Sequence, residues 1–131
     1  MSKIKKLLLG LVVVIGCIGL VFYFGLKDML DDFSEEVSKI EINSVDLSNL
    51  EDGEYEGTYE FNELVGATVK VVIEDNRIVN IHIIEHKNGR GRKAEEIVNS
   101  VVNTQSLQVD TVSGATGSSI IILKAIEDAL K

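Results

Sequence analysis

The segment 113–119, Ser-Gly-Ala-Thr-Gly-Ser-Ser, combines small residues with four hydroxyl side chains directly before a helix-like pattern. Small residues allow a ligand to approach the backbone, and the first turn of a helix offers unpaired N–H groups with a partial positive charge. This chemistry suits an anion, with phosphate as the first candidate. A glycine-containing loop with a Ser or Thr N-cap is also a common way to begin any helix. The residues alone leave both explanations open.

Three strand-like runs precede this segment, at residues 55–61, 68–74 and 77–85. The second run alternates, with Val69, Val71 and Ile73 on one face, and in the third run Val79, Ile81 and Ile83 share a face. The dipeptide Asp75-Asn76 between these two runs predicts a tight hairpin.

Two helices are predicted after the strands, because apolar residues recur there at helical spacing. The two stripes consist of Ala94, Ile97, Val98, Val101 and Val102, and of Ile122, Ala125, Ile126, Ala129 and Leu130. This order of elements predicts an α+β domain over residues 51–131, in which a small antiparallel sheet has two helices packed on one side.

The stretch 7–26 contains twenty residues without a charge and follows three lysines at positions 3, 5 and 6. Twenty helical residues rise about 30 Å, which matches the hydrocarbon core of a bilayer. We therefore expect a transmembrane anchor at 7–26, a cytoplasmic N-terminus at 1–6 and an extracytoplasmic remainder. Cleavage as a signal peptide, or lipoprotein processing at Val-Ile-Gly-Cys17, remain the alternatives, and each also exports residues 27–131.

Residues 27–50 are acidic and contain neither Gly nor Pro. Met29, Leu30, Phe33 and Val37 recur at helical spacing, which predicts a short helix next to the membrane. A charged spacer that holds the domain off the membrane explains the same composition. The turn signal at Asp52-Gly53 marks the start of the domain.

The charge of the exported part excludes nucleic acid as a partner. The chain has 131 residues, room for one domain, and residues 27–131 carry 10 Lys and Arg against 21 Asp and Glu, a net charge of −11. Such a surface repels phosphate backbones. The single cysteine, Cys17, lies in the apolar run, so the domain has no disulfide or thiolate metal site, and no His, Asp or Glu spacing matches a metal site.

The residues Asp110-x-x-Ser113-Gly114-Ala115-Thr116 resemble the flavinylation motif of the FMN-binding domain family. That family includes the covalent-FMN subunits of the sodium-pumping NADH:quinone reductase and of the Rnf complex, and small exported electron-transfer flavoproteins. The likeness extends over about residues 50–131. Its further parts are Asp52-Gly53-x-Tyr55-x-Gly57, Glu85-His86-Lys87-Asn88-Gly89 and Ser118-Ser119.

The resemblance implies that the last threonine of the motif, Thr116, is esterified by the phosphate of FMN. In the family a separate flavin transferase makes this bond, with FAD as donor and Mg²⁺ on the transferase. The other motif residues then form its recognition sequence; they are Asp110, Ser113, Gly114, Ala115, Gly117 and Ser118. Gly117 departs from the larger residue common at that position. His86 is either a flavin contact or a residue of a solvated loop.

The function implied is that of a membrane-anchored, extracytoplasmic electron-transfer flavoprotein with covalent FMN. Its electron donor would be a quinone-linked or NADH-linked membrane complex. We expect a carrier or a component of a redox complex rather than a self-sufficient enzyme. The alternatives are a surface binding or structural module of the same fold without flavin, and a domain that binds FMN reversibly.

Overall fold

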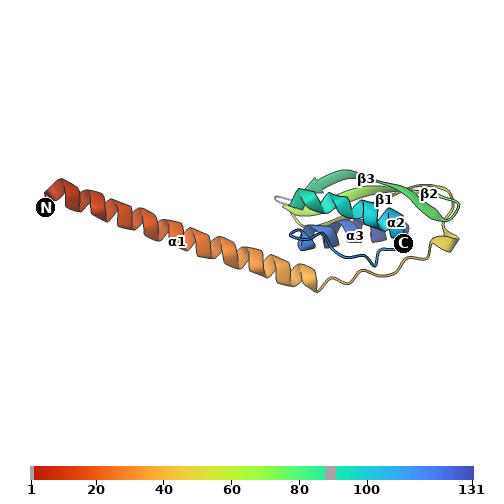
Figure 1. Cartoon of the computed structure of the whole chain (residues 1–131), viewed down its shortest axis with the longest axis horizontal. Coiled ribbons are helices and arrows are strands. Elements are labelled where there is room, and N and C mark those ends of the chain that lie inside the picture. Colours follow the sequence, from red (N-terminus) through yellow and green to blue (C-terminus); the bar gives the residue numbers. More distant parts are fainter. Residues whose placement is uncertain (1, 88–90) are drawn as a thin grey trace. The chain divides into compact units, whose positions relative to one another are not determined.

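The computed structural model describes residues 2–87 and 91–131. The chain divides into two units, Met1–Glu35 and Glu36–Lys131, which are coloured along the sequence in Figure 1. Asn88 and Gly89 lie outside the described residues. They are the last two residues of the family-like stretch Glu85-His86-Lys87-Asn88-Gly89.

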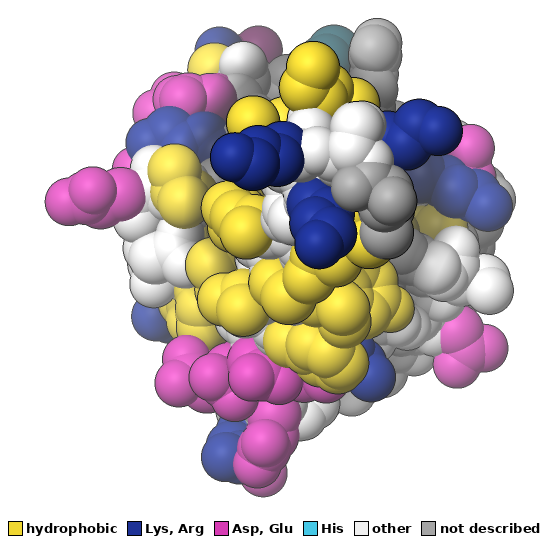
Figure 2. Space-filling view, turned by 90° about the vertical axis from the view of Figure 1, so that its left-hand side faces the viewer, with side chains coloured by type: hydrophobic (Ala, Val, Ile, Leu, Met, Phe, Trp, Pro, Cys, Tyr) yellow, Lys and Arg dark blue, Asp and Glu magenta, His cyan; other side chains and the backbone are white. Residues whose placement is uncertain are grey.

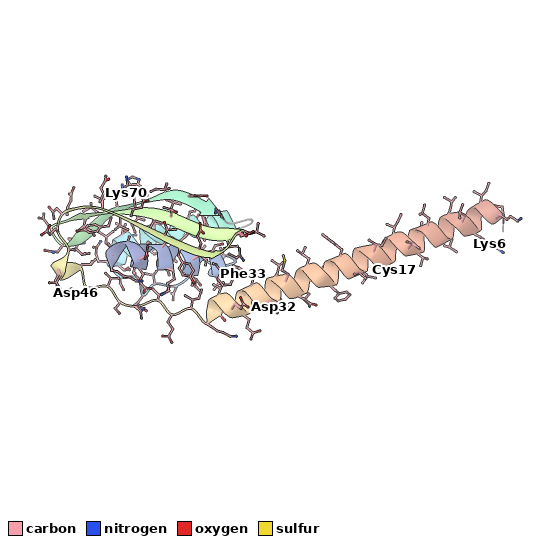
Figure 3. The ribbon with its side chains drawn as sticks, turned by 180° about the vertical axis from the view of Figure 1, so that it is seen from behind. Lys6, Cys17, Asp32, Phe33, Asp46 and Lys70 are labelled. Atoms are coloured by element: carbon pink, nitrogen blue, oxygen red, sulfur yellow. The ribbon has the colours of Figure 1, made fainter. Side chains whose placement is uncertain are left out.

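The first unit is the larger part of one long helix, α1 (Lys3–Ser38), whose 36 residues rise about 54 Å. Its length and apolar composition are sufficient to cross a membrane. Side chains such as Lys6, Cys17 and Asp32 point outward along it (Figure 3). Figure 2 draws one face of the whole chain, on which hydrophobic, basic and acidic side chains are all exposed. Since α1 extends from Lys3 to Ser38 without a break, the short helix predicted after the apolar stretch is a direct continuation of the apolar helix.

The second unit contains a three-stranded antiparallel sheet in the order β1 (Gly53–Asn62), β2 (Val65–Glu74) and β3 (Arg77–Lys87). Asp75 and Asn76 join β2 to β3 with φ angles of 51° and 59°. Two successive positive φ angles are typical of the two-residue hairpin turn whose twist matches that of the strands. The predicted hairpin is confirmed.

Val69, Val71 and Ile73, which the alternation predicts to share one face of β2, are all fully buried on its inner face. This prediction is confirmed. In β3 the predicted face is confirmed for Ile81 and Ile83 but is wrong for Ile78 and Val79. The register shifts against β2 between Val72 and Ile73, next to these two residues, and again between Thr68 and Val69. Each shift adds one residue to β3 and changes the face of those that follow. As a result the inner face has Ile78, Ile81 and Ile83, whereas Val79 and Ile84 are exposed.

Two helices cover this inner face, as predicted. A short 3-10 helix η2 (Gly91–Glu96) leads into α2 (Ile97–Thr104), which packs against β3, and α3 (Thr116–Leu130) packs against β1 and β2. All five residues of the predicted α3 stripe are buried, and Ala94, Ile97 and Val101 of the first stripe are fully buried.

Residues 40–50 form a third layer, on the side of α3 away from the sheet (Figure 1). Ile42, Val45, Leu47 and Leu50 pack against the core, and the 3-10 helix η1 (Leu47–Asn49) lies in this segment. The backbone of the segment is also fixed, since the side-chain amide of Asn76 donates to the carbonyl oxygens of Leu47, Ser48 and Leu50 at 3.0–3.1 Å. This part of the acidic stretch is integrated into the domain.

Candidate functional site

The residues Val112 to Ala115 form a tight turn immediately before α3. The amide of Ala115 donates to the carbonyl oxygen of Val112 at 2.9 Å, which closes a four-residue turn. Gly114, at its third position, has a φ angle of +79°. A type II turn requires a positive φ at this position, and glycine adopts it without steric cost. Gly114 of the Ser-Gly-Ala-Thr sequence is therefore explained by the backbone conformation of the turn.

Thr116 is the first residue of α3, and it is exposed. The capping position before it is taken by Ala115, which makes no side-chain cap hydrogen bond. The first amide of α3 to find an intrahelical carbonyl is that of Ser119, which donates to Ala115 at 2.9 Å. The amides of Thr116, Gly117 and Ser118 therefore have no carbonyl four residues earlier within the helix. An accessible hydroxyl thus stands beside a helix N-terminus, where a negative charge is stabilised.

The four hydroxyl residues of the segment divide into two pairs. Ser113 and Thr116 are exposed, as are Asp110 and Gly114, and Gly117 is partly exposed. Ser118 is 8% exposed and Ser119 is fully buried. Only the first pair offers a hydroxyl group to a large ligand or to another protein, and no hydroxyl residue occupies the N-cap that the sequence suggested.

Ser119 was not among the predicted site residues, yet in the structure its hydroxyl makes two hydrogen bonds with the turn. Its Oγ accepts a hydrogen bond from the Val112 amide at 3.0 Å and donates one to the Ala115 carbonyl oxygen at 2.7 Å. The sequence does contain a signal for its burial. Ser119 lies three residues before Ile122 and seven before Ile126, which places it in line with the apolar stripe of α3.

His86 lies near the end of β3, at the same end of the domain as the start of α3 (Figure 1). Its side chain is only 1% exposed, and its Nδ1 lies 3.3 Å from Oε1 of Glu95. The side chain is therefore packed inside the domain rather than in a solvated loop, and in this structure it presents no surface to a ligand at Thr116.

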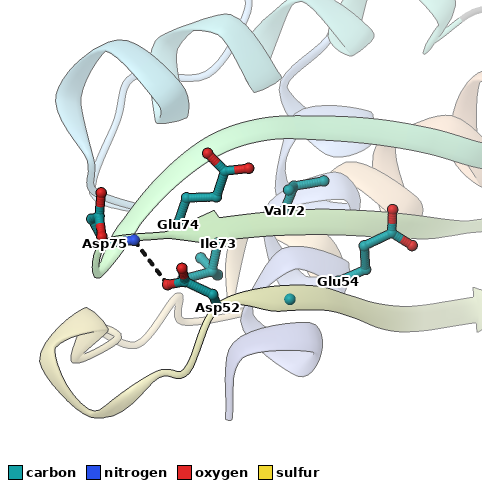
Figure 4. A pocket seen from close by; sticks show the side chains of 7 residues that line it. Asp52, Glu54, Val72, Ile73, Glu74 and Asp75 are labelled. Atoms are coloured by element: carbon teal, nitrogen blue, oxygen red, sulfur yellow. Dashed lines mark hydrogen bonds between the residues drawn. The ribbon is translucent and has the colours of Figure 1, made fainter.

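A shallow cavity of about 470 Å³ lies beside the β2–β3 hairpin. Figure 4 shows four carboxylates around it, those of Asp52, Glu54, Glu74 and Asp75, with the Asp75 amide donating to Asp52 at 2.9 Å. Four acidic side chains repel a phosphate. The hairpin also lies at the end of the sheet away from the start of α3 (Figure 1), so this cavity is no part of the anion site.

Within residues 2–87 and 91–131, no group of three or more His, Cys, Asp or Glu side chains is placed to hold a metal ion. The site at the start of α3 consists of a hydroxyl group, helix amides and small residues. This set fits a phosphate ester: Thr116 provides the oxygen, and Gly114, beside which a Cβ would meet only open space, leaves room next to it.

The fold and the turn define a small α+β domain that presents an accessible threonine at the start of its last helix and that follows an apolar N-terminal helix in the sequence. A family model described as the FMN-binding domain matches residues 65–131, and the chain belongs to this family. The matched range contains the whole turn and Thr116. No curated protein matches the chain.

Proposed function

We propose that this protein is a membrane-anchored, extracytoplasmic electron-transfer flavoprotein that carries FMN covalently on Thr116. Membership of the FMN-binding domain family supports FMN as the cofactor. The observation that carries the covalent assignment is the position of Thr116. It is the last residue of the flavinylation motif, it is exposed, and it begins a helix.

An accessible hydroxyl is what a separate flavin transferase requires. In the proposed transfer from FAD, the Thr116 Oγ forms a bond to the phosphorus of the FMN portion, the bond between the two phosphates breaks, and AMP leaves. The hydroxyl proton passes to a base of the transferase, which also holds the Mg²⁺. The proposed recognition residues Asp110 and Ser113 are exposed as well, and are therefore available to such an enzyme.

After attachment, the first turn of α3 stabilises the remaining negative charge of the phosphodiester. Its amides and the helix dipole favour an anion by about 0.3–1 kcal/mol at an exposed position. When bound, FMN supplies one- and two-electron redox chemistry, while the protein supplies attachment, orientation and electrostatics. A covalent bond also retains the cofactor outside the membrane, where a dissociated flavin would be lost by dilution.

The proposed location follows from the N-terminal sequence. α1 is long and apolar enough to cross a membrane, and the lysines before it favour a cytoplasmic N-terminus. The domain would then meet two partners outside the cytoplasm, a membrane electron donor such as a quinone-linked or NADH-linked complex and an external acceptor. In this proposal the flavin is the redox group of the domain.

The test is flavin fluorescence in an SDS gel, using full-length protein co-expressed and exported with a flavin transferase. Fluorescence that stays with the denatured chain supports the covalent carrier. Flavin that appears only in the native protein and leaves on denaturation indicates reversible binding. A folded protein without flavin under these conditions indicates a surface module of the same fold.

A further inference from the structure

Ser119 joins the two ends of the turn that precedes Thr116. Its hydroxyl oxygen accepts from the amide of Val112, the first residue of the turn, and donates to the carbonyl of Ala115, the last. The side chain is fully buried. One serine, a single helical turn beyond Thr116, therefore holds the turn from inside the domain.

The start of the helix does not itself require this hydroxyl. The backbone amide of Ser119 already donates to the Ala115 carbonyl oxygen at 2.9 Å, which is the first intrahelical bond of α3. An alanine would satisfy that bond equally well and would avoid placing a polar group in a fully buried position. What the hydroxyl adds is an acceptor for the Val112 amide and a second donor to Ala115. Both of these bonds fix the turn.

The turn also depends on this link for its conformation. Gly114 adopts a positive φ angle, and the only other described hydrogen bond that closes the turn is the one from Ala115 to Val112. A glycine-containing turn with one closing bond has other accessible conformations. Since Thr116 directly follows the turn, its orientation relative to the recognition residues before it depends on which conformation is populated.

We propose that Ser119 is a positioning residue for flavin attachment: it holds the turn in the one conformation that presents Thr116 to the flavin transferase. The inference rests on the proposed function and identifies a residue beyond the attachment threonine on which modification depends. Without the hydroxyl, only a fraction of molecules would display the competent turn. The apparent affinity for the transferase falls by that fraction, whereas the reaction of a correctly bound molecule is unchanged.

The experiment measures flavin transfer to full-length apoprotein in nanodiscs, with purified flavin transferase, FAD and Mg²⁺. We expect Ser119→Ala to raise KM about tenfold and to leave kcat unchanged, because tenfold corresponds to ~1.4 kcal/mol, which is within the combined scale of the two hydrogen bonds that are lost. Ser119→Thr, which retains a hydroxyl able to bond the carbonyl four residues earlier, should stay within about twofold of the wild type. Thr104→Ala is the matched control, because Thr104 makes the same kind of bond in α2, to Ser100 at 2.8 Å, away from the turn.

Amide hydrogen exchange on the same samples separates positioning from general loss of stability. In Ser119→Ala the Val112 amide should exchange about tenfold faster, on the same hydrogen-bond scale, while the amide of Ile126 inside α3 stays as protected as in the wild type. A KM within about twofold of the wild type, or a loss of transfer that follows faster exchange throughout α3, would overturn the proposal. A wild type that accepts no flavin at all would instead overturn the proposed function, and the role of Ser119 with it.

Discussion

Gly114 is the residue of the turn whose identity is dictated by the backbone alone. Its φ angle is +79°, and a Cβ built on it would meet no atom within 4 Å. A side chain at this position would therefore have space, and its cost would come only from the left-handed backbone conformation. Gly114 is therefore required for its backbone conformation and not for close packing. The loss of stability on substitution measures the cost of that conformation alone.

We predict that Gly114→Ala lowers the free energy of unfolding by about 1–2 kcal/mol, the usual cost of a left-handed conformation for a residue with a Cβ. Urea denaturation of the domain followed by circular dichroism measures this change. Ser113→Ala is the control, because Ser113 is exposed in the same turn and should change stability by less than about 0.5 kcal/mol. Equal stability of the two variants would contradict the turn described here.

At this scale the sequence predicted the turn and its place before a helix, but not the hydrogen bonds that hold the turn. Small residues and hydroxyls before a helix pattern were sufficient to predict an accessible turn at a helix N-terminus. They did not reveal that Ala115 would be the N-cap, or that Ser119 would be buried behind the turn. Four hydroxyls within seven residues offer several ways to satisfy the same backbone groups, and tertiary packing decides which of them points inward.

At the level of the elements, β1 and α3 lie in close contact at Gly57, which is buried in the middle of the strand. A Cβ on Gly57 would collide with the backbone carbonyl of Ala125 and with the backbone and Cβ of Ala129. These are helix backbone atoms, which cannot move aside in the way that the end of a flexible side chain can. The glycine in Asp52-Gly53-x-Tyr55-x-Gly57 is therefore explained by helix packing.

Gly57→Ala should destabilise the domain by about 3 kcal/mol or more, the upper range for overpacking. The neighbouring substitution Glu56→Ala is the control, since Glu56 is exposed on the same strand and should have little effect. Thermal or urea unfolding compares the two. If both variants unfold at the same point, the close contact between β1 and α3 is incorrect.

The segment 40–50 is attached to α3 through a nearly buried carboxylate, that of Glu127, which is 4% exposed. It accepts hydrogen bonds from the Asn43 side chain at 2.8 Å, from the Asn43 amide at 3.3 Å and from Lys124 at 2.9 Å. Burial raises the pKa of Glu127, but the hydrogen bonds from Asn43 and Lys124 and the charge of Lys124 outweigh it, so the pKa lies below its ordinary value of 4.5.

A lowered pKa means that the folded state favours the charged form. The contribution of Glu127 to stability is therefore fully present above pH 4.5, and it is lost as the pH falls through the lower pKa of the folded state. We predict that Glu127→Gln is less stable than the wild type at pH 7 by roughly 1–2 kcal/mol, and that this difference shrinks as the pH falls toward 3. Unfolding measured from pH 7 to pH 3 tests it, with the exposed Glu63→Gln as control. A difference that is independent of pH would contradict the assignment.

Most of the helices and strands could be predicted, because the spacing of apolar residues along the sequence indicates which face of an element is buried. The buried positions of β2 and α3 follow the predicted stripes. The β3 prediction failed at Ile78 and Val79 because the register shift there inserts one residue, which a strict alternation of two cannot represent. The packing of residues 40–50 was also not predicted, since their apolar residues are spaced irregularly and contact the core from an extended segment.

For the whole molecule, the distribution of charge is the main guide to topology. All 21 Asp and Glu residues follow the apolar stretch, whereas three Lys precede it. We predict that protease added to intact spheroplasts removes the domain and leaves an N-terminal tag protected. A C-terminal tag that stays protected until the membrane is opened would contradict an extracytoplasmic domain, and detergent-treated samples provide the control.

The central claim is that Thr116 carries FMN through an ester bond, and intact-protein mass tests it most directly. Full-length wild type and Thr116→Ala are each co-expressed and exported with a flavin transferase, and circular dichroism confirms that both are folded. We predict that the wild type is heavier than its bare chain by one FMN less one water, and that Thr116→Ala has the mass of its bare chain. The same increment on folded Thr116→Ala, or no increment on the wild type, would contradict attachment at Thr116.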